Sequence, residues 1–123
     1  MYEDLAHRIL KLDRKIIDCN ILSESDGAVL ADVVRPEYQE RIGGFSKTGS
    51  GMGPNWSMAM VSILKRLDDE RSKLNYVHVA RALFDAMFFL AYRKGKSLII
   101  GILLDKGSEP AKIYGQVLKL IKS

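Results

Sequence analysis

Residues 16–34 read IIDCNILSESDGAVLADVV, and this stretch does most to decide the fold. Two apolar segments lie on either side of Asp26-Gly27. Asp-Gly between two apolar runs is a strong signal for a β-hairpin, because glycine adopts the positive φ of a tight turn at little cost. Pro36 ends the second segment, since proline cannot donate to a β-ladder. The stretch therefore predicts a hairpin of two strands, at residues 16–22 and 28–34.

An amphipathic helix is predicted before the hairpin. Its apolar residues are spaced four, three and four positions apart, at Leu5, Ile9, Leu12 and Ile16. This spacing places them on one face of a helix with 3.6 residues per turn. Acidic residues in the first turn and basic residues in the last match the helix dipole. We expect this helix at about residues 2–14.

A longer amphipathic helix is predicted after the hairpin, with Asn55 as its N-cap. Its main apolar stripe has the same four, three, four spacing, at Trp56, Met60, Ile63 and Leu67. The apolar arc is wider in the first half than packing on one sheet requires. Two interpretations stay open: the helix is simply well buried in its own domain, or it also faces a partner. Tryptophan and methionine are enriched at interfaces, which slightly favours the second.

Three further apolar segments predict a three-stranded meander. The expected strands are Tyr76 to Leu83, Met87 to Tyr92 and Ser97 to Leu104. Turns are expected at residues 84–86 and 94–96. Strands this apolar on both faces are normally covered on both, by helices or by a second subunit.

A closing helix is predicted after the meander, with Ser108 as its N-cap and Pro110 tolerated in its first turn. Its apolar side consists of Ile113, Val117, Leu120 and Ile121.

The element order is therefore α-β-β-α-β-β-β-α. Short connections within the two strand groups predict a five-stranded antiparallel sheet. We expect the long helix on one face and the two terminal helices on the other, which is an α+β three-layer sandwich. A length of 123 residues predicts a single domain over 1–123.

A glycine-rich connection spans residues 43–53 and contains Lys47. A phosphate-binding Walker loop needs glycine immediately before that lysine and five residues earlier still, but Ser46 and Arg41 occupy those positions. The expected role is a flexible loop before a helix. A weaker alternative is an anion site in which backbone N–H groups, Lys47 and Asn55 hold a negative group at the helix N-terminus.

No residues predict catalysis, a metal site or a cofactor site. His7 and His78 each lack a nearby histidine, cysteine or carboxylate cluster in the sequence. Three aspartates fall on the expected hairpin without a histidine partner, and we expect turn or surface roles for them: Asp18, Asp26 and Asp32. Without a paired nucleophile and base, the sequence favours a protein that is not an enzyme.

The formal net charge of +4 is unevenly distributed, with −2 over residues 1–50 and +6 over residues 51–123. Because the basic residues are scattered through turns and helix faces, we expect solvated surface charge and no nucleic-acid partner. The only cysteine, Cys19, excludes an internal disulfide framework and favours a reducing compartment. An acidic N-terminus and the lack of any apolar run near about 18 residues predict a cytoplasmic protein without membrane insertion.

The chain resembles the roadblock (dynein light chain) family, within the wider profilin-like group. The resemblance covers essentially all 123 residues. It is carried by the element order, the Ser25-Asp26-Gly27 hairpin after an isoleucine-rich strand, the long central helix and the closing helix at Ile113–Ile121. The chain is also similar to small archaeal proteins whose openings resemble residues 7–13 and whose endings resemble residues 118–122.

This resemblance implies a non-enzymatic scaffold. Roadblock proteins dimerise through the central helix and the middle strand into a continuous two-subunit sheet, and they bind small Ras-like GTPases or other signalling proteins. Mapped onto this sequence, the implied dimer surface consists of Trp56, Met60, Ile63, Leu64, Tyr76, Val77, His78, Val79, Ala80 and Arg81. The alternative function is a small-ligand sensory domain of the profilin-like group, which would need a polar-lined cavity.

Overall fold

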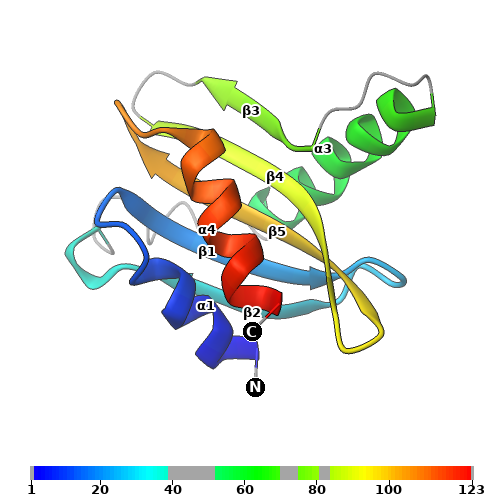
Figure 1. Ribbon diagram of the computed structural model, residues 1–123, viewed down its shortest axis with the longest axis horizontal. Coiled ribbons are helices and arrows are strands. Elements are labelled where there is room, and N and C mark those ends of the chain that lie inside the picture. The colour runs from blue at the N-terminus through cyan, green and yellow to red at the C-terminus, as the bar shows by residue number, and fades with distance from the viewer. Residues whose placement is uncertain (1, 39–51, 70–74, 81–83, 123) are drawn as a thin grey trace.

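The computed structural model describes residues 2–38, 52–69, 75–80 and 84–122. Within the long helix it describes the side chains of residues 57–63, 65 and 66. The elements, labelled as in Figure 1, are α1 (Tyr2–Leu10), β1 (Ile16–Ser23), β2 (Val29–Val34), a short 3-10 turn η1 (Pro36–Tyr38), α3 (Met52–Asp69), β3 (Val77–Ala80), β4 (Phe84–Arg93), β5 (Lys96–Asp105) and α4 (Pro110–Lys122). The predicted order of helices and strands is confirmed.

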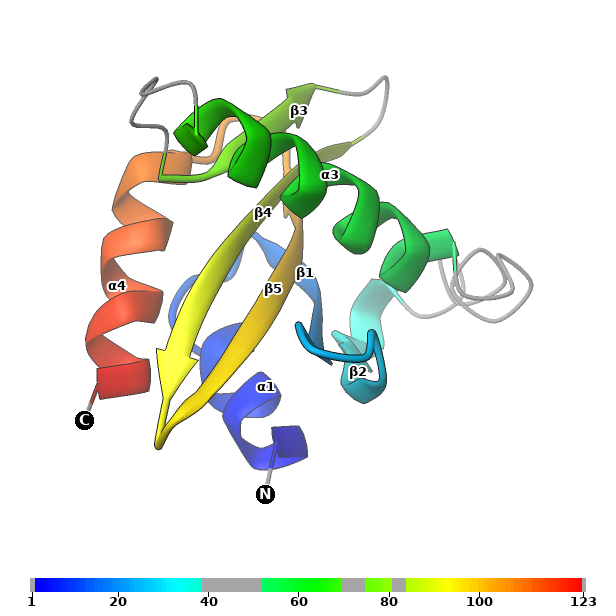
Figure 2. The ribbon, with the colours of Figure 1, turned by 90° about the vertical axis from the view of Figure 1, so that its right-hand side faces the viewer.

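The strands form one antiparallel sheet in the order β2-β1-β5-β4-β3. The fifth strand along the chain, β5, lies at the centre of the sheet. It joins the first hairpin to the rest of the meander. Figure 2 shows α3 on one face of the sheet and α1 and α4 on the other. The α+β three-layer sandwich predicted from the sequence is therefore confirmed.

Two apolar cores fill the spaces between the layers. The larger lies between the sheet and the terminal helices and includes Ile9, Ile21, Phe89, Ile100 and Val117. The smaller lies under α3 and consists of Leu22, Val61, Ala86, Phe88 and Ile99, with half-buried side chains around it.

The first helix ends at Leu10, earlier than the predicted residue 14. Arg35 causes this early end. Its guanidinium donates to the carbonyl oxygens of Leu10, of Asp13 at 2.9 Å and of Ile16 at 2.8 Å. The bond to Leu10 satisfies the last carbonyl of the helix, and the bonds to Asp13 and Ile16 hold the turn that leads into β1.

The turn predicted at residues 84–86 is wrong, because these residues begin β4. Asp85 pairs with Leu104 and Ala86 with Leu103 across the sheet. Within the strand, the carboxylate of Asp85 pairs with Lys106 Nζ at 2.6 Å. The strand predicted over 76–83 is confirmed in part: β3 is Val77–Ala80, and residues 81–83 lie outside the described residues.

The predicted N-caps of two helices are also wrong. The long helix α3 begins at Met52, so Asn55 lies inside its first turns. Pro54 fits there because the first N–H groups of a helix have no partner within it. At α4, the Ser108 hydroxyl donates to the Asp105 carbonyl at 2.5 Å, and the helix begins at Pro110 as its first residue.

Candidate functional site

The surface implied for dimerisation lies at the β3 edge of the sheet and on α3 beside it. Of the described strands, only β4 pairs with β3, so the other side of β3 is a free sheet edge. An unpaired edge presents a row of backbone donors and acceptors to another strand. This edge is therefore the place where a second chain can extend the sheet.

The residues of β3 divide between the two faces of the sheet. Val77 pairs with Phe88 and Val79 with Ala86, and both partners belong to the core under α3. Val77 and Val79 are therefore half-buried on the α3 face. His78 and Ala80 are exposed on the opposite face. Tyr76 is half-buried there too, and its ring stacks against Tyr114 of α4 at 5.3 Å between centroids.

On α3, Ile63 is the one large apolar side chain that is exposed among those the structure describes. Its relative exposure is 46%, whereas Val61 is 2% exposed and Met60 is half-buried against the core. The predicted surface therefore has exposed apolar area beside a free strand edge. The side chains of Trp56 and Leu64, and all of Arg81, lie outside the described residues, so their predicted place in the surface stays a prediction.

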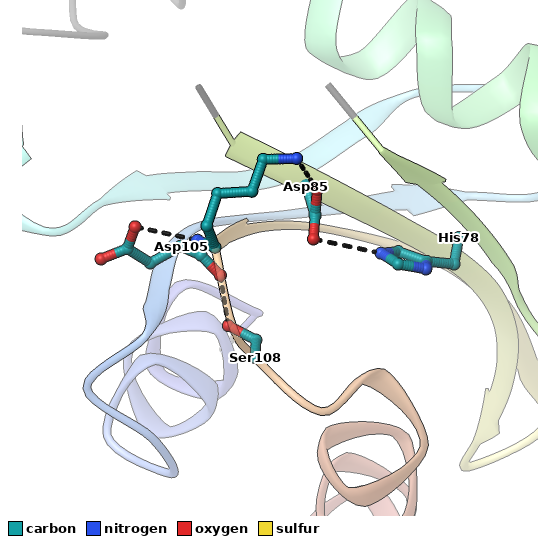
Figure 3. A network of polar contacts seen from close by, with 5 residues as sticks. His78, Asp85, Asp105 and Ser108 are labelled. Atoms are coloured by element: carbon teal, nitrogen blue, oxygen red, sulfur yellow. Dashed lines mark hydrogen bonds and ion pairs between the residues drawn. The ribbon is translucent and has the colours of Figure 1, made fainter. Parts of the chain in front are cut away.

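A polar network joins β3 to the rest of the sheet (Figure 3). The carboxylate of Asp85 accepts a bond from Lys106 Nζ at 2.6 Å and lies 3.4 Å from His78 Nε2. The hydrogen bond from Lys106 does most to hold the pKa of Asp85 below its usual value, and His78 adds to it. Because the Ser108 hydroxyl donates to a backbone carbonyl, it makes no nucleophile–base pair with His78. The network therefore helps to hold β3 against β4.

A second group of polar residues lies beneath α3, and the sequence did not predict it. Asn20 pairs with Asp32 across β1 and β2, and Asp18 lies two residues before Asn20 on the same face. The carboxyl group of Asp32 lies near that of Asp18. Burial, followed by the charge of Asp32, raises the pKa of Asp18 to about 8. Its Oδ1 is buried without a partner among the described residues.

The turn or surface role predicted for Asp18 is therefore wrong, whereas Asp26 has the expected turn role. Asp26 is exposed, and its Oδ1 accepts a bond from the Ala28 N–H at 3.0 Å. The sequence signal that could have located Asp18 and Asn20 is their strict alternation with apolar residues. That alternation places both on one face of a strand that the sheet buries on both sides.

The weak anion site predicted from Lys47 and Asn55 stays a prediction. Lys47 lies outside the described residues, and nothing describes the Asn55 side chain. Among the residues that the structure describes, no group of three or more histidine, cysteine, aspartate or glutamate side chains could hold a metal ion. Nor does any helix in this part of the chain have the length and apolar character needed to cross a membrane.

No protein-family model and no curated protein matches the sequence. Solved structures do match the fold. A Roadblock/LC7 domain from Streptomyces avermitilis has a TM-score of 0.68 at 13% identity, over 98% of this chain and 91% of that one. MglB from Myxococcus xanthus has a TM-score of 0.57 at 9% identity, over 98% and 94%. MglB with a tetrameric arrangement has a TM-score of 0.52 at 9% identity, over 97% and 86%. The chain therefore has the fold of a Roadblock/LC7 domain.

Proposed function

We propose that this protein is a homodimeric, non-enzymatic scaffold that regulates a signalling partner. The observation that carries the proposal is the free β3 edge next to the exposed apolar surface of α3. Pairing of two β3 strands about a two-fold axis would remove both edges and bring the two α3 helices together on one face. The tetrameric arrangement of MglB, a protein of the same fold, supports assembly through this architecture.

The partner that we propose is a small Ras-like GTPase, as the resemblance to roadblock proteins implies. The small-ligand sensor has less support. The buried polar side chains under α3 bond to each other, with the Ser57 hydroxyl donating to Asn20 Oδ1 at 2.8 Å. A Cβ atom built on Gly101 would lie 2.5 Å from the same Asn20 oxygen, so this polar centre is tightly filled. A ligand-binding sheet needs space beside such polar groups.

Sedimentation of matched variants tests the dimer surface. Ile63→Glu places a charge on the proposed contact, and we expect it to shift the wild-type dimer to monomer. Val29→Glu is the control, because Val29 is 52% exposed on β2, at the other edge of the sheet. It should remain dimeric. Equal dissociation of both variants, or a monomeric wild type at high micromolar concentration, would overturn the proposal.

Binding to small Ras-like GTPases from the source organism tests the proposed partner. Calorimetry should detect binding of the wild-type protein to one of them, loaded with GDP or with a non-hydrolysable GTP analogue. Ile63→Glu should weaken that binding if the partner contacts the dimer, and Val29→Glu should not. If none of the organism's small GTPases binds, this half of the proposal is wrong.

A further inference from the structure

His78 lies on the free edge strand β3, on the face of the sheet that α4 covers. It pairs with Met87 of β4, whose side chain belongs to the core on that face. Its Nε2 lies 3.4 Å from Asp85 Oδ2 (Figure 3). The His78 side chain keeps 37% of its surface exposed, whereas that of Asp85 keeps 12%. The imidazole is therefore in contact with a carboxylate and still open to solvent.

Among the described residues, the fixed charges that face His78 are already paired with each other. From the connection between β5 and α4, Lys106 Nζ lies 2.6 Å from Asp85 Oδ1. The hydrogen bond from Lys106 lowers the pKa of Asp85, so this ion pair persists at mildly acidic pH. Protonation of His78 therefore adds a net positive charge to this network.

The helices on either side of the sheet supply no described charge to offset it. From α4, Tyr114 reaches this side of β3 through its ring contact with Tyr76. Burial raises the pKa of the Tyr114 phenol, so the phenol stays neutral at physiological pH. On the other face, the side chains that β3 presents to α3 are Val77 and Val79.

Pairing of two β3 strands about a two-fold axis would bring the two copies of His78 together. Residues that lie opposite each other in an antiparallel pair share a face, so the axis passes beside a residue that faces its own copy. β3 is Val77–Ala80, and its centre is at His78 and Val79. With the axis at His78, its two Cβ atoms lie about 4.5–5.5 Å apart, and with the axis at Val79 they are diagonal neighbours about 7–8 Å apart. Either register places both imidazoles on one face of the joined sheet.

We propose that His78 makes the dimer pH-sensitive: two neutral imidazoles are compatible with the β3–β3 contact, and two protonated ones destabilise it. This inference rests on the proposed function, because it needs the two-fold pairing of β3. Like charges that are opposite or diagonal on neighbouring strands repel each other. Pairing also removes water from a side chain that is partly exposed in the single chain, and this loss disfavours the charged form.

Acid should therefore weaken the dimer. The contact of His78 with Asp85 is made within one chain, so it is present in monomer and dimer alike. Repulsion and loss of water occur only in the dimer, which for this reason binds fewer protons than two separate chains. The dimer is fully stable where histidine is neutral, and it weakens as the pH falls from about 8 to about 5, the range in which histidine gains its charge.

Sedimentation of the full chain at about pH 8 and at about pH 5.5 measures this effect through the dissociation constant of the dimer. We expect the wild-type constant to be about tenfold higher at the lower pH, the size of effect that two charges several ångströms apart near a protein surface produce. His78→Gln is always neutral and should form an equally tight dimer at both pH values. His78→Lys is always charged and should form a weak dimer at both.

The chain supplies its own control, since its second histidine, His7, is exposed on α1. His7→Gln should keep the pH dependence of the wild type. Asp18 also gains a proton over this range, because burial raises its pKa to about 8, but it does so in every variant. The difference between the wild type and His78→Gln therefore isolates the effect of His78.

The results separate this inference from the proposed dimer. A wild type that is monomeric at about pH 8 would overturn both. A dimer whose dissociation constant is the same at both pH values, or falls in acid, would overturn the role of His78 and leave the dimer standing. So would a change with pH in His78→Gln that equals the change in the wild type.

Discussion

At the scale of single residues, the polar side chains of Asn20 and Ser57 under α3 leave room only for glycine at position 101. A Cβ atom at this position would lie 2.5 Å from Asn20 Oδ1 and closer still to Ser57 Oγ. The strand β5 lies between two others and cannot shift easily. We expect Gly101→Ala to lower the free energy of unfolding by about 2 kcal/mol, as overpacking of a core does.

Gly115→Ala is the matched control for that measurement. Gly115 is within α4, and a Cβ atom there would meet nothing within 4 Å. Alanine has the higher helix propensity, so this variant should stabilise the protein by about 0.5–1 kcal/mol. Urea denaturation of both variants checks the pair. A stability for Gly101→Ala equal to that of the wild type would show that the polar centre has spare room.

Arg35 is the residue that ends α1, and its loss should be costly. Arg35→Leu leaves the carbonyl groups of Leu10, Asp13 and Ile16 without their shared donor. Bonds from a charged donor are worth about 1.5–3 kcal/mol, so we expect a loss in that range from the free energy of unfolding. Arg35→Lys should recover only part of it, because an ammonium group cannot bridge three carbonyls with a planar fork. Full recovery by lysine would contradict this account of the helix end.

At the scale of elements, the sequence predicted in order the α-helices and strands that the structure describes, but it misplaced several of their ends. Periodicity located the elements because each apolar face is buried in the fold. The ends depend on distant residues: Arg35 ends α1, and Lys106 allows Asp85 to sit within a strand. Rules for caps and turns consider only neighbouring residues in the sequence, so they could not identify Arg35 or Lys106. The carboxyl pair was missed for the same reason, since only the β1–β2 register brings Asp18 to Asp32.

The docking of β3 on β4 should depend on pH through Asp85. Its pKa is lowered in the fold, chiefly by Lys106, so the stabilisation is present above the ordinary pKa of about 4 and is lost as pH falls below it. Lys106→Met should therefore destabilise the protein at about pH 6, and the difference from the wild type should disappear at strongly acidic pH.

Urea denaturation at both pH values measures this effect. Lys112→Met is the control, because Lys112 is an exposed lysine on α4. It should leave stability unchanged at both values. A difference between Lys106→Met and the wild type that persists unchanged in acid would show that the lysine acts by packing and not through Asp85.

At the scale of the whole molecule, the two faces of the sheet have unequal cover. The helices α1 and α4 cover one face, whereas α3 alone covers the other, where Ile63 is 46% exposed. The wide apolar arc of the long helix left two interpretations open in the sequence, burial within the domain and contact with a partner. The sequence could not show that β3 lies at the edge of the sheet, because strand order follows from long-range pairing.

Short-range cross-linking tests whether two β3 strands pair in the dimer. His78→Cys places a thiol on the exposed side of β3, and Tyr92→Cys places one at a position on β4 that is 68% exposed in the wild type. With a short bismaleimide, we expect the first variant to be captured as a covalent dimer of twice the 13.8 kDa chain mass, and the second to stay monomeric on a denaturing gel. Failure of His78→Cys to cross-link, or equal cross-linking of both variants, would show that the β3 strands do not pair.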